Sequence, residues 1–284
     1  MKNIWLLYEE CDLNVNRDYV AAMRKAGKLL DLNIKAVTVE ELSLTMNAMG
    51  IPGLLMEGKE IRPDAVISRM RIPLYSRHFE LMDIPVFNGS KVCDICNDKR
   101  YTHQFLRGLP MPSTVFMAGN AYEPSAYPKV VKPACSHGGD RVKLVKDISE
   151  YRMALEDVLP EPGLVQDAAQ NSGWDLRVYV LFGQIVAGVM RHATKKEEII
   201  SNYKQGGAVA LHTLTRDEES LAKEVIRRFD EAGAPLCFAG IDFLFDTDGP
   251  IIGEVEDVVG SRMLYKTSDI DIISLYLKEI KERI

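Results

Sequence analysis

The first 90 residues alternate between short apolar runs and amphipathic stretches. Residues 3–8 and 35–39 are typical of buried strands, because apolar side chains dominate both runs. Between them, residues 16–30 repeat apolar side chains at helical spacing, which predicts a helix. The same alternation continues over residues 65–69, 74–82 and 85–87. This order of strands and helices predicts a small open α/β unit with a parallel sheet.

The pattern changes after about residue 90. A polar helix is predicted over residues 90–107, and the Pro110-Met111-Pro112 sequence ends it. Short strands follow, several joined by turns that contain glycine, at residues 114–117, 129–133, 142–145, 163–167, 175–181, 184–191, 238–245 and 251–256. Helices are predicted at residues 149–159, 217–233 and 269–284. Strands that follow one another in hairpins predict an α+β arrangement.

Composition narrows the class of protein. The chain has 284 residues, of which 46% are hydrophobic and 27% charged, so it should fold into two or three domains. The net charge of −6 argues against nucleic acid or an anionic membrane surface as a partner. No apolar stretch has the length of a signal peptide core or a membrane helix, and five scattered cysteines argue against a disulfide framework. We therefore expect a cytoplasmic protein with reduced thiols.

Three acidic residues lie on one predicted hairpin near the end of the chain. If five residues after Phe245 form the turn, Phe245 pairs with Ile251 and antiparallel counting places Asp242 opposite Glu254. Side chains alternate along a strand, so Glu256 shares the face of Glu254. Opposed carboxylates destabilise a sheet unless a cation lies between them, and such oxygen ligands suit Mg²⁺ or Mn²⁺. A solvated sheet face with three acids is the alternative interpretation.

A basic strand followed by a loop with two glycines lies earlier in the chain. Lys132 stands near the end of the run at residues 129–133, and the next loop carries Gly138 and Gly139. The backbone N–H groups of such a loop, together with one ammonium group, can bind a phosphate chain. Because loops with two glycines are common, an ordinary surface loop is the alternative.

A predicted hairpin between these two features carries charges on one face. Asp175, Arg177 and Tyr179 alternate along one strand, and Arg191 lies on the next strand. A polar loop with glycines at residues 201–207 comes after this hairpin and has the composition of a ligand-binding loop. An exposed face of salt bridges is the alternative interpretation.

The order of these motifs resembles one known family. The matching motifs are Asp98-Lys99, Lys132-Pro133, Gln166-Asp167, Trp174-Asp175-Leu176-Arg177, Arg191, Ser201-Asn202, Gly206-Gly207, Gly240-Ile241-Asp242 and Glu254-Val255-Glu256. Over about residues 85–284 the chain resembles the RimK-like carboxylate–amine ligases of the ATP-grasp superfamily. The most specific parts are the loop at residues 201–207 and the run from Gly249 to Ile272.

The resemblance implies a fold and an activity. The fold is an α/β N-terminal domain over residues 1–90, followed by an α+β ATP-grasp fold whose central and C-terminal domains cover residues 91–166 and 167–284. The activity is an ATP-dependent, ADP-forming ligase that uses Mg²⁺ and joins a carboxylate to an amine through an acyl phosphate. The substrates are small molecules or peptides, with an amino acid as the expected amine. Relatives of this type often pair, so a homo-oligomer is left open.

The resemblance also implies roles for individual residues. Lys99 and Lys132 would hold the nucleotide, with Lys132 nearest the phosphates. Arg191 and Asn202 match residues near the γ-phosphate and the acyl phosphate, so these two and Lys132 are the implied catalytic residues. The implied metal ligands are Asp242, Glu254 and Glu256. Further nucleotide contacts are implied for Ser136, His137, Gly138, Gly139, Arg141, Gln166, Asp167, Ala168, Asp175, Ser201 and Asn202.

Several positions depart from the family pattern. Glu256 stands in place of the usual Asn, and the added charge bears on the choice between Mg²⁺ and Mn²⁺. The segment after it lacks the usual Ser-Pro-Gly, so the chain leaves open whether glutamate is the incoming amine. Ser136 and Arg141 stand where glycines are common, which stiffens the loop. A nucleotide-binding protein without ligase turnover and an ATP-grasp kinase therefore remain as alternatives.

Two smaller clusters have competing interpretations. The Cys93-x-x-Cys96 spacing with His103 suggests zinc, but one cysteine pair without a second favours buried thiols. A basic set near the end of the first unit predicts either a carboxylate-binding rim or solvated surface. This set consists of Arg69, Arg71, Arg77 and His78.

Overall fold

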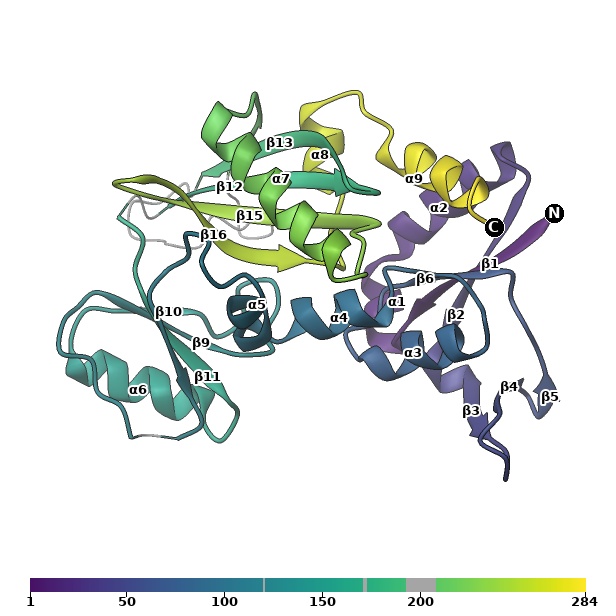
Figure 1. Cartoon of the computed structure of the whole chain (residues 1–284), viewed down its shortest axis with the longest axis horizontal. Coiled ribbons are helices and arrows are strands. Elements are labelled where there is room, and N and C mark those ends of the chain that lie inside the picture. Colours follow the sequence, from purple (N-terminus) through teal and green to yellow (C-terminus); the bar gives the residue numbers. More distant parts are fainter. Residues whose placement is uncertain (120, 171–172, 193–207) are drawn as a thin grey trace.

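A computed structural model describes residues 1–119, 121–170, 173–192 and 208–284 of the chain. Three main sheets build the molecule, and Figure 1 shows the N-terminal sheet at one end and a smaller sheet with α6 (Ile148–Val158) at the other. The largest sheet, with α7 (Arg216–Glu231) beside it, lies between and above them. In the part of the chain that is described, no helix is long and apolar enough to cross a membrane.

The N-terminal sheet has the order β2-β1-β6-β7, and each neighbouring pair is parallel. In β1, Ile4 and Leu6 pack into one hydrophobic cluster, whereas Trp5 and Leu7 pack into another. A strand buried on both faces is apolar at every position, which is why the sequence pattern found it. The elements are β1 (Lys2–Tyr8), α1 (Glu10–Val15), α2 (Arg17–Leu29), β2 (Leu32–Thr38), β6 (Ala65–Ser68), α3 (Pro73–Leu81) and β7 (Val86–Phe87). The predicted parallel α/β unit is confirmed.

A small antiparallel sheet that the sequence pattern did not predict is inserted between β2 and β6. Its strands have the order β3-β4-β5 and lie beyond the main N-terminal sheet in Figure 1. Only Leu54 of these strands is fully buried, so the apolar signal is weak. The strands are β3 (Leu42–Met46), β4 (Pro52–Met56) and β5 (Lys59–Glu60).

The single helix predicted over residues 90–107 is wrong, because two helices meet there. Helix α4 (Ser90–Asn97) ends at Asp98, and α5 (Lys99–Phe105) begins directly after it. The Asp98 side chain accepts a hydrogen bond from the Arg100 backbone N–H, which caps the second helix. This break places Lys99 at the first turn of a new helix.

The smaller sheet has the order β10-β9-β11-β8 and is antiparallel throughout. Its inner face packs against α6 through residues such as Val131, Tyr151 and Val165. The strands are β8 (Thr114–Met117), β9 (Lys129–Pro133), β10 (Lys143–Val145) and β11 (Gly163–Asp167).

The largest sheet has the order β14-β13-β12-β15-β16, again antiparallel. Alternate residues Leu176 and Val178 of β12 pack with Val225 and Phe229 of α7 in one hydrophobic cluster. Because α7 covers this face, the residues between them point to the opposite face. The strands are β12 (Trp174–Leu181), β13 (Gln184–His192), β14 (Ala208–His212), β15 (Phe238–Asp246) and β16 (Gly249–Glu256), and helices α8 (Arg262–Thr267) and α9 (Ile272–Lys281) follow.

The acidic hairpin β15–β16 has a shorter turn than predicted. Asp246 pairs with Gly249, so two residues form the turn and Phe245 pairs with Pro250 instead of Ile251. The register shifts once between Asp242 and Phe243, which leaves Gly253 as an extra residue in β16. The two differences cancel, and Asp242 lies opposite Glu254, as predicted.

Candidate active site

The face of the largest sheet opposite α7 carries a network of paired charges. Arg177 on β12 lies opposite Asp242 on β15 and donates through Nε and Nη2 to its two carboxylate oxygens, both at 2.7 Å. Arg191 on β13 lies opposite Asp175, donates to it through Nε, and reaches Asp242 Oδ2 at 2.7 Å through Nη2. The predicted common face of Asp175, Arg177 and Tyr179 is confirmed, and Arg191 closes it.

Arg177 also joins the third acid of the hairpin. Its Nη1 lies 2.6 Å from Glu256 Oε2. Gly240 makes this possible, because a Cβ at that position would lie 3.2 Å from both Cδ and Nε of Arg177. The guanidinium therefore lies over a strand position without a side chain and balances the charge that Glu256 adds.

Asp242 and Glu256 have opposite electrostatic environments. Burial alone would raise the pKa of Asp242, but the charges of Arg177 and Arg191 lower it below the ordinary range. Burial raises the pKa of Glu256; the charge of Arg177 lowers it only in part, and the charges of Asp242 and Glu254 raise it further. The Oε2 atom of Glu256 is buried and makes no hydrogen bond of good geometry within the described residues.

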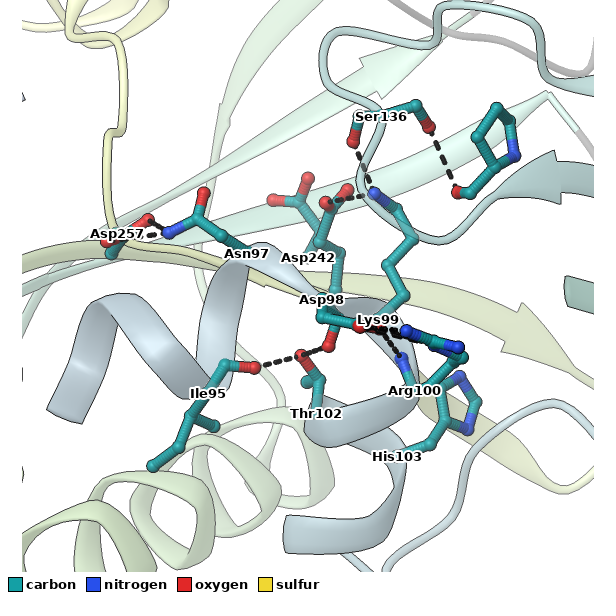
Figure 2. A network of polar contacts seen from close by, with 12 residues as sticks. Ile95, Asn97, Asp98, Lys99, Arg100, Thr102, His103, Ser136, Asp242 and Asp257 are labelled. Atoms are coloured by element: carbon teal, nitrogen blue, oxygen red, sulfur yellow. Dashed lines mark hydrogen bonds and ion pairs between the residues drawn. The ribbon is translucent and has the colours of Figure 1, made fainter. Parts of the chain in front are cut away.

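Two lysines meet the carboxylates from the smaller sheet and α5. Lys99 is buried, donates from Nζ to the Ser136 carbonyl, and lies 3.3 Å from Glu254 Oε1. Figure 2 shows the Lys99 side chain directed toward Ser136, near Asp242. Burial, and then the charge of Lys99, lowers the pKa of Lys132 on β9 to about 8. Lys99 thus pairs with Glu254, and the charge of Glu254 also acts on Lys132.

The predicted phosphate loop connects β9 to β10. Ser136 is buried, and Gly138 and Gly139 have φ of 64° and 79°, a left-handed region that favours glycine. Arg141 also has a positive φ of 52°, which explains why glycine is common at this position, and its guanidinium binds both oxygens of Glu161. The structure therefore turns Arg141 toward Glu161.

His137 lies in the same loop between β9 and β10. Burial, and then the charges of Arg71 and Lys99, lowers the pKa of His137 to about 4, so this imidazole is neutral at pH 7. Its pKa also responds to Glu254, so the loop lies within electrostatic range of the acidic hairpin.

The residues predicted to contact adenine and ribose follow β11. Gln166 is buried, lies 2.9 Å from His103 Nε2, and donates to Thr114. Asp167 is exposed and pairs with Lys129, and Ala168 comes directly after the strand. Ser201, Asn202 and the glycines after them lie outside the described residues, so the structure places neither catalytic Asn202 nor Ser201.

Comparison with known sequences identifies the family. The sequence model of the RimK-like ATP-grasp domain matches residues 120–280. The chain belongs to the RimK-like ATP-grasp family. Among curated relatives, a probable alpha-L-glutamate ligase 2 from Shewanella frigidimarina is 30% identical over 264 residues, which cover 84% of each chain. N-acetylaspartylglutamate synthase A from Homo sapiens is 28% identical and covers 95% of this chain and 73% of its own.

Solved structures agree with this fold. A D-alanine–D-alanine ligase from Bacillus anthracis complexed with ATP has a TM-score of 0.74 at 17% identity and covers 99% of this chain and 97% of its own. The ATP-grasp ligase PsnB complexed with a minimal precursor variant, Mg and ADP has a TM-score of 0.70, with coverage of 98% and 97%. The predicted ATP-grasp fold and the predicted class, an ATP-dependent carboxylate–amine ligase, are confirmed.

The acidic residues on this face of the RimK-like domain are suited to hard cations, although Arg177, Arg191 and Lys99 form ion pairs with them. Asp242, Glu254 and Glu256 supply only carboxylate oxygens, which are the donors that Mg²⁺ prefers. Glu256 Oε2 is a buried acceptor without a well-formed hydrogen bond. Over the described ranges, however, no three His, Cys, Asp or Glu side chains are grouped closely enough to hold a metal ion. Bound cations would therefore replace some contacts of the arginines.

Several contacts around this RimK-like site were not predicted from the sequence. Asn97, at the end of α4, donates to both carboxylate oxygens of Asp257, and Figure 2 shows the two side chains facing each other. Burial raises the pKa of Asp257 to about 7. Arg69 donates from Nη1 to the Val259 carbonyl at 3.0 Å and from Nη2 to the Val258 carbonyl at 3.3 Å. These pairs join segments more than 150 residues apart, and no local pattern encodes them.

The structure shows where the residues of the two smaller clusters lie. All five cysteines are free, and Cys93 and Cys96 are buried, which agrees with the interpretation as thiols. In the predicted basic rim, Arg69 and Arg71 lie near the acidic hairpin and the loop, since Arg69 responds to Glu256 and His137 responds to Arg71. The other two members face elsewhere: Arg77 pairs with Asp94, and His78 lies 2.8 Å from the Gly53 carbonyl.

Proposed function

We propose that this chain uses ATP and Mg²⁺ to activate a carboxylate as an acyl phosphate, which an amine then attacks to form an amide. The observation that carries the proposal is the ion pair of the buried Lys99 with Glu254 of the acidic hairpin, next to the half-buried Lys132. Lys99 and Lys132 come from α5 and β9, and both interact with Glu254 on β16. Positive and metal-binding groups at one junction of two sheets are what a triphosphate requires.

The proposed roles follow from charge. Lys99 and Lys132 lie near each other with Glu254 as their shared anion, so a phosphate chain would relieve the repulsion between them. Arg191 is the cation for the charge that develops on the transferring phosphoryl group. Asp242, Glu254 and Glu256 would hold Mg²⁺, which screens the charge of the triphosphate when bound. The residues then act mainly by position and charge, because phosphoryl transfer needs no nucleophilic side chain.

The glycine loop has the proposed role of a cover. Ser136 accepts a hydrogen bond from Lys99, and Gly138 and Gly139 provide the backbone conformations of a tight turn over the phosphates. An acyl phosphate hydrolyses when water reaches it, so such a cover would keep the amine as the only nucleophile. The proposed adenine contacts are Gln166, Asp167 and Ala168, with Asp175 near the ribose.

Substrates and location are proposed from the relatives and the composition. Relatives are named as alpha-L-glutamate ligases, so an amino acid such as L-glutamate is the first amine to test. We further propose domain limits near residues 90 and 166, a cytoplasmic location, and a homo-oligomeric state to be measured in solution.

A direct test measures ADP and amide formation together. Purified protein is incubated with ATP, Mg²⁺ and a panel of acids and amino acids, and ADP and products are followed by chromatography and mass. The expected result is one ADP per amide. ADP with a phosphorylated acid and no amide would favour the kinase alternative, and ATP binding without ADP would favour the binding protein.

A matched pair of variants ties this activity to the acidic hairpin. Glu254→Gln should lower ADP formation at least about 100-fold, because one carboxylate that faces the nucleotide loses its charge. The fold should persist, because the Glu254 side chain is 33% exposed and, among the described residues, forms one ion pair, with Lys99 at 3.3 Å. Glu219→Gln removes the same kind of ion pair from the surface of α7 and serves as the control. Full turnover in Glu254→Gln would show the hairpin assignment to be wrong.

A further inference from the structure

The connections of the N-terminal sheet diverge at one point of the sheet. Its strands run in parallel with the order β2-β1-β6-β7. From β1 the chain continues through α1 and α2 to β2 on one side, and from β6 it continues through α3 to β7 on the other. The connections therefore diverge between β1 and β6, and ligands of open α/β sheets bind at the carboxyl ends of the strands at such a point.

An ion pair lies at the point where these connections diverge. Asp12, on α1 just after β1, accepts from Arg71, just after β6, with 2.5 Å between Oδ2 and Nη1. Both side chains remain accessible, at 27% for Asp12 and 31% for Arg71. Behind the pair, the hydroxyl of Tyr8 and the Nε of Arg69 are buried and have no hydrogen-bond partner within the described part of the chain. This end of the N-terminal sheet therefore carries buried polar groups whose hydrogen bonding is incomplete.

The pair lies beside the reaction site. Arg69, two residues before Arg71, donates to the carbonyls of Val258 and Val259, which directly follow the acidic strand β16. His137 of the glycine loop responds to the charges of Arg71, Asp12 and Glu254. The Arg71–Asp12 pair therefore borders the space between the acidic hairpin, the loop and the N-terminal sheet.

We propose that the Arg71–Asp12 pair binds the α-carboxylate and α-ammonium groups of an amino acid that is activated at its side-chain carboxylate. This inference rests on the proposed ligase function. An amino acid carries a cation and an anion one carbon apart, which matches a neighbouring carboxylate and guanidinium. An ammonium group bound to Asp12 keeps its proton and is no nucleophile. The molecule in this site is thus the acid substrate, and its distal carboxylate faces the phosphates.

Hydroxylamine can replace the unknown amine in the test. L-glutamate and L-aspartate are supplied with ATP, Mg²⁺ and hydroxylamine, which converts an acyl phosphate to a stable hydroxamate and releases phosphate. Fragmentation in the mass spectrometer locates the hydroxamate. The expected product carries it on the side-chain carboxyl. A hydroxamate on the α-carboxyl would overturn the proposal.

Blocked probes and variants assign each charge. For L-glutamate, Arg71→Met and Asp12→Asn should each raise KM at least about tenfold, because each removes a charged hydrogen-bond partner. L-glutamate α-amide lacks the α-carboxylate, so Arg71→Met should change its KM less than about twofold. N-acetyl-L-glutamate lacks the α-ammonium group, so Asp12→Asn should change its KM less than about twofold. The proposal would be overturned if the ratio of KM for a blocked probe to KM for L-glutamate were the same in both variants as in the wild-type protein.

The control is a second Arg–Asp pair, which joins α3 of the N-terminal domain to α4. Arg77 on α3 lies 2.6 Å from Asp94 on α4. Arg77→Met should leave every KM unchanged, and melting curves together with binding of a fluorescent ATP analogue report folding in all variants. A wild-type protein that shows neither hydroxamate formation nor thermal stabilisation with L-glutamate or L-aspartate would overturn the amino-acid site. The ligase proposal is judged separately, by ADP and amide formation with the wider panel.

Discussion

The two sheets that meet at the nucleotide site balance their charges differently. On the face of the largest sheet opposite α7, each buried arginine contacts two carboxylates: Arg177 pairs with Asp242 and Glu256, and Arg191 pairs with Asp175 and Asp242. On the smaller sheet, Lys132 has a like charge, Lys99, as a neighbour and shares Glu254 with it. On the first face two arginines pair with three carboxylates, so each cation has a partner, whereas the two lysines share one carboxylate and carry an excess of positive charge.

This difference separates stability from binding. Burying a charge is costly unless it is paired, so the arginine–carboxylate face should contribute to the fold and tolerate little change. The lysine pair is under repulsion in the free protein and should become favourable only when an anion binds. We therefore expect the largest sheet to supply a fixed frame and the two lysines to supply the affinity for phosphates.

The largest expected effect comes from breaking the arginine–carboxylate face. Sequence reasoning alone would treat Asp242→Asn as a change of a metal ligand that leaves the fold intact. In the structure the change removes the anion shared by Arg177 and Arg191, so we expect the free energy of unfolding to fall by about 3–5 kcal/mol. Urea unfolding at pH 7 measures this loss. A loss below about 1 kcal/mol would mean that other groups neutralise the two arginines.

The comparison also shows what a sequence can encode. The opposition of Asp242 and Glu254 was predicted correctly, although the turn is three residues shorter than assumed and β16 contains a bulge. A bulge inserts one residue without changing the apolar pattern around it, and Gly253 was the only local signal. Face assignments therefore depend on counting along a strand, and errors in that count can cancel or add.

Other parts of the fold have no local signal. Buried strands such as β1 were found because both faces are apolar, whereas β3 and β4 lie near the surface and alternate weakly. The break between α4 and α5 depends on a single capping residue, Asp98. The Arg71–Asp12 pair joins residues 59 positions apart, so only the tertiary structure brings the two charges together.

A smaller change in the free energy of unfolding, of opposite sign, is expected when Lys132 is replaced. Burial and the charge of Lys99 lower the pKa of Lys132 to about 8, so its charged form destabilises the free protein at pH 7. Lys132→Met should therefore raise the free energy of unfolding at pH 7 by about 2 kcal/mol. The same variant should lose affinity for ATP at least about tenfold, because one ammonium group no longer faces the phosphates.

The pH dependence of the free energy of unfolding tests whether charge causes the stabilisation by Lys132→Met. In the unfolded chain the lysine keeps its proton to about pH 10.4, whereas in the folded protein Lys132 loses it near pH 8. The unfolded state binds more protons between these values, so the stability of the wild-type protein gains from rising pH there. The advantage of Lys132→Met should shrink from pH 8 and vanish near pH 10.5. An advantage that stays constant over this range would point to packing instead of charge.

The smallest expected effect distinguishes Glu256 from Asp242 on the same face. Burial raises the pKa of Glu256, so its charged form is disfavoured in the folded protein, and Arg177 keeps both hydrogen bonds to Asp242 when Glu256 is neutral. Glu256→Gln should therefore change the free energy of unfolding by less than about 1 kcal/mol at pH 7, in the stabilising direction.

The sign follows from proton binding. A carboxyl group with a raised pKa binds its proton more tightly in the folded state, so the stability of the wild-type protein falls as pH rises through that pKa. The variant should accordingly gain relative to wild type between pH 4.5 and pH 7 in paired urea titrations. If Glu256→Gln instead loses as much stability as Asp242→Asn, then Glu256 is as strong a partner of Arg177 as Asp242 is. The extra acid would then belong to the structural frame and would be less available to cations.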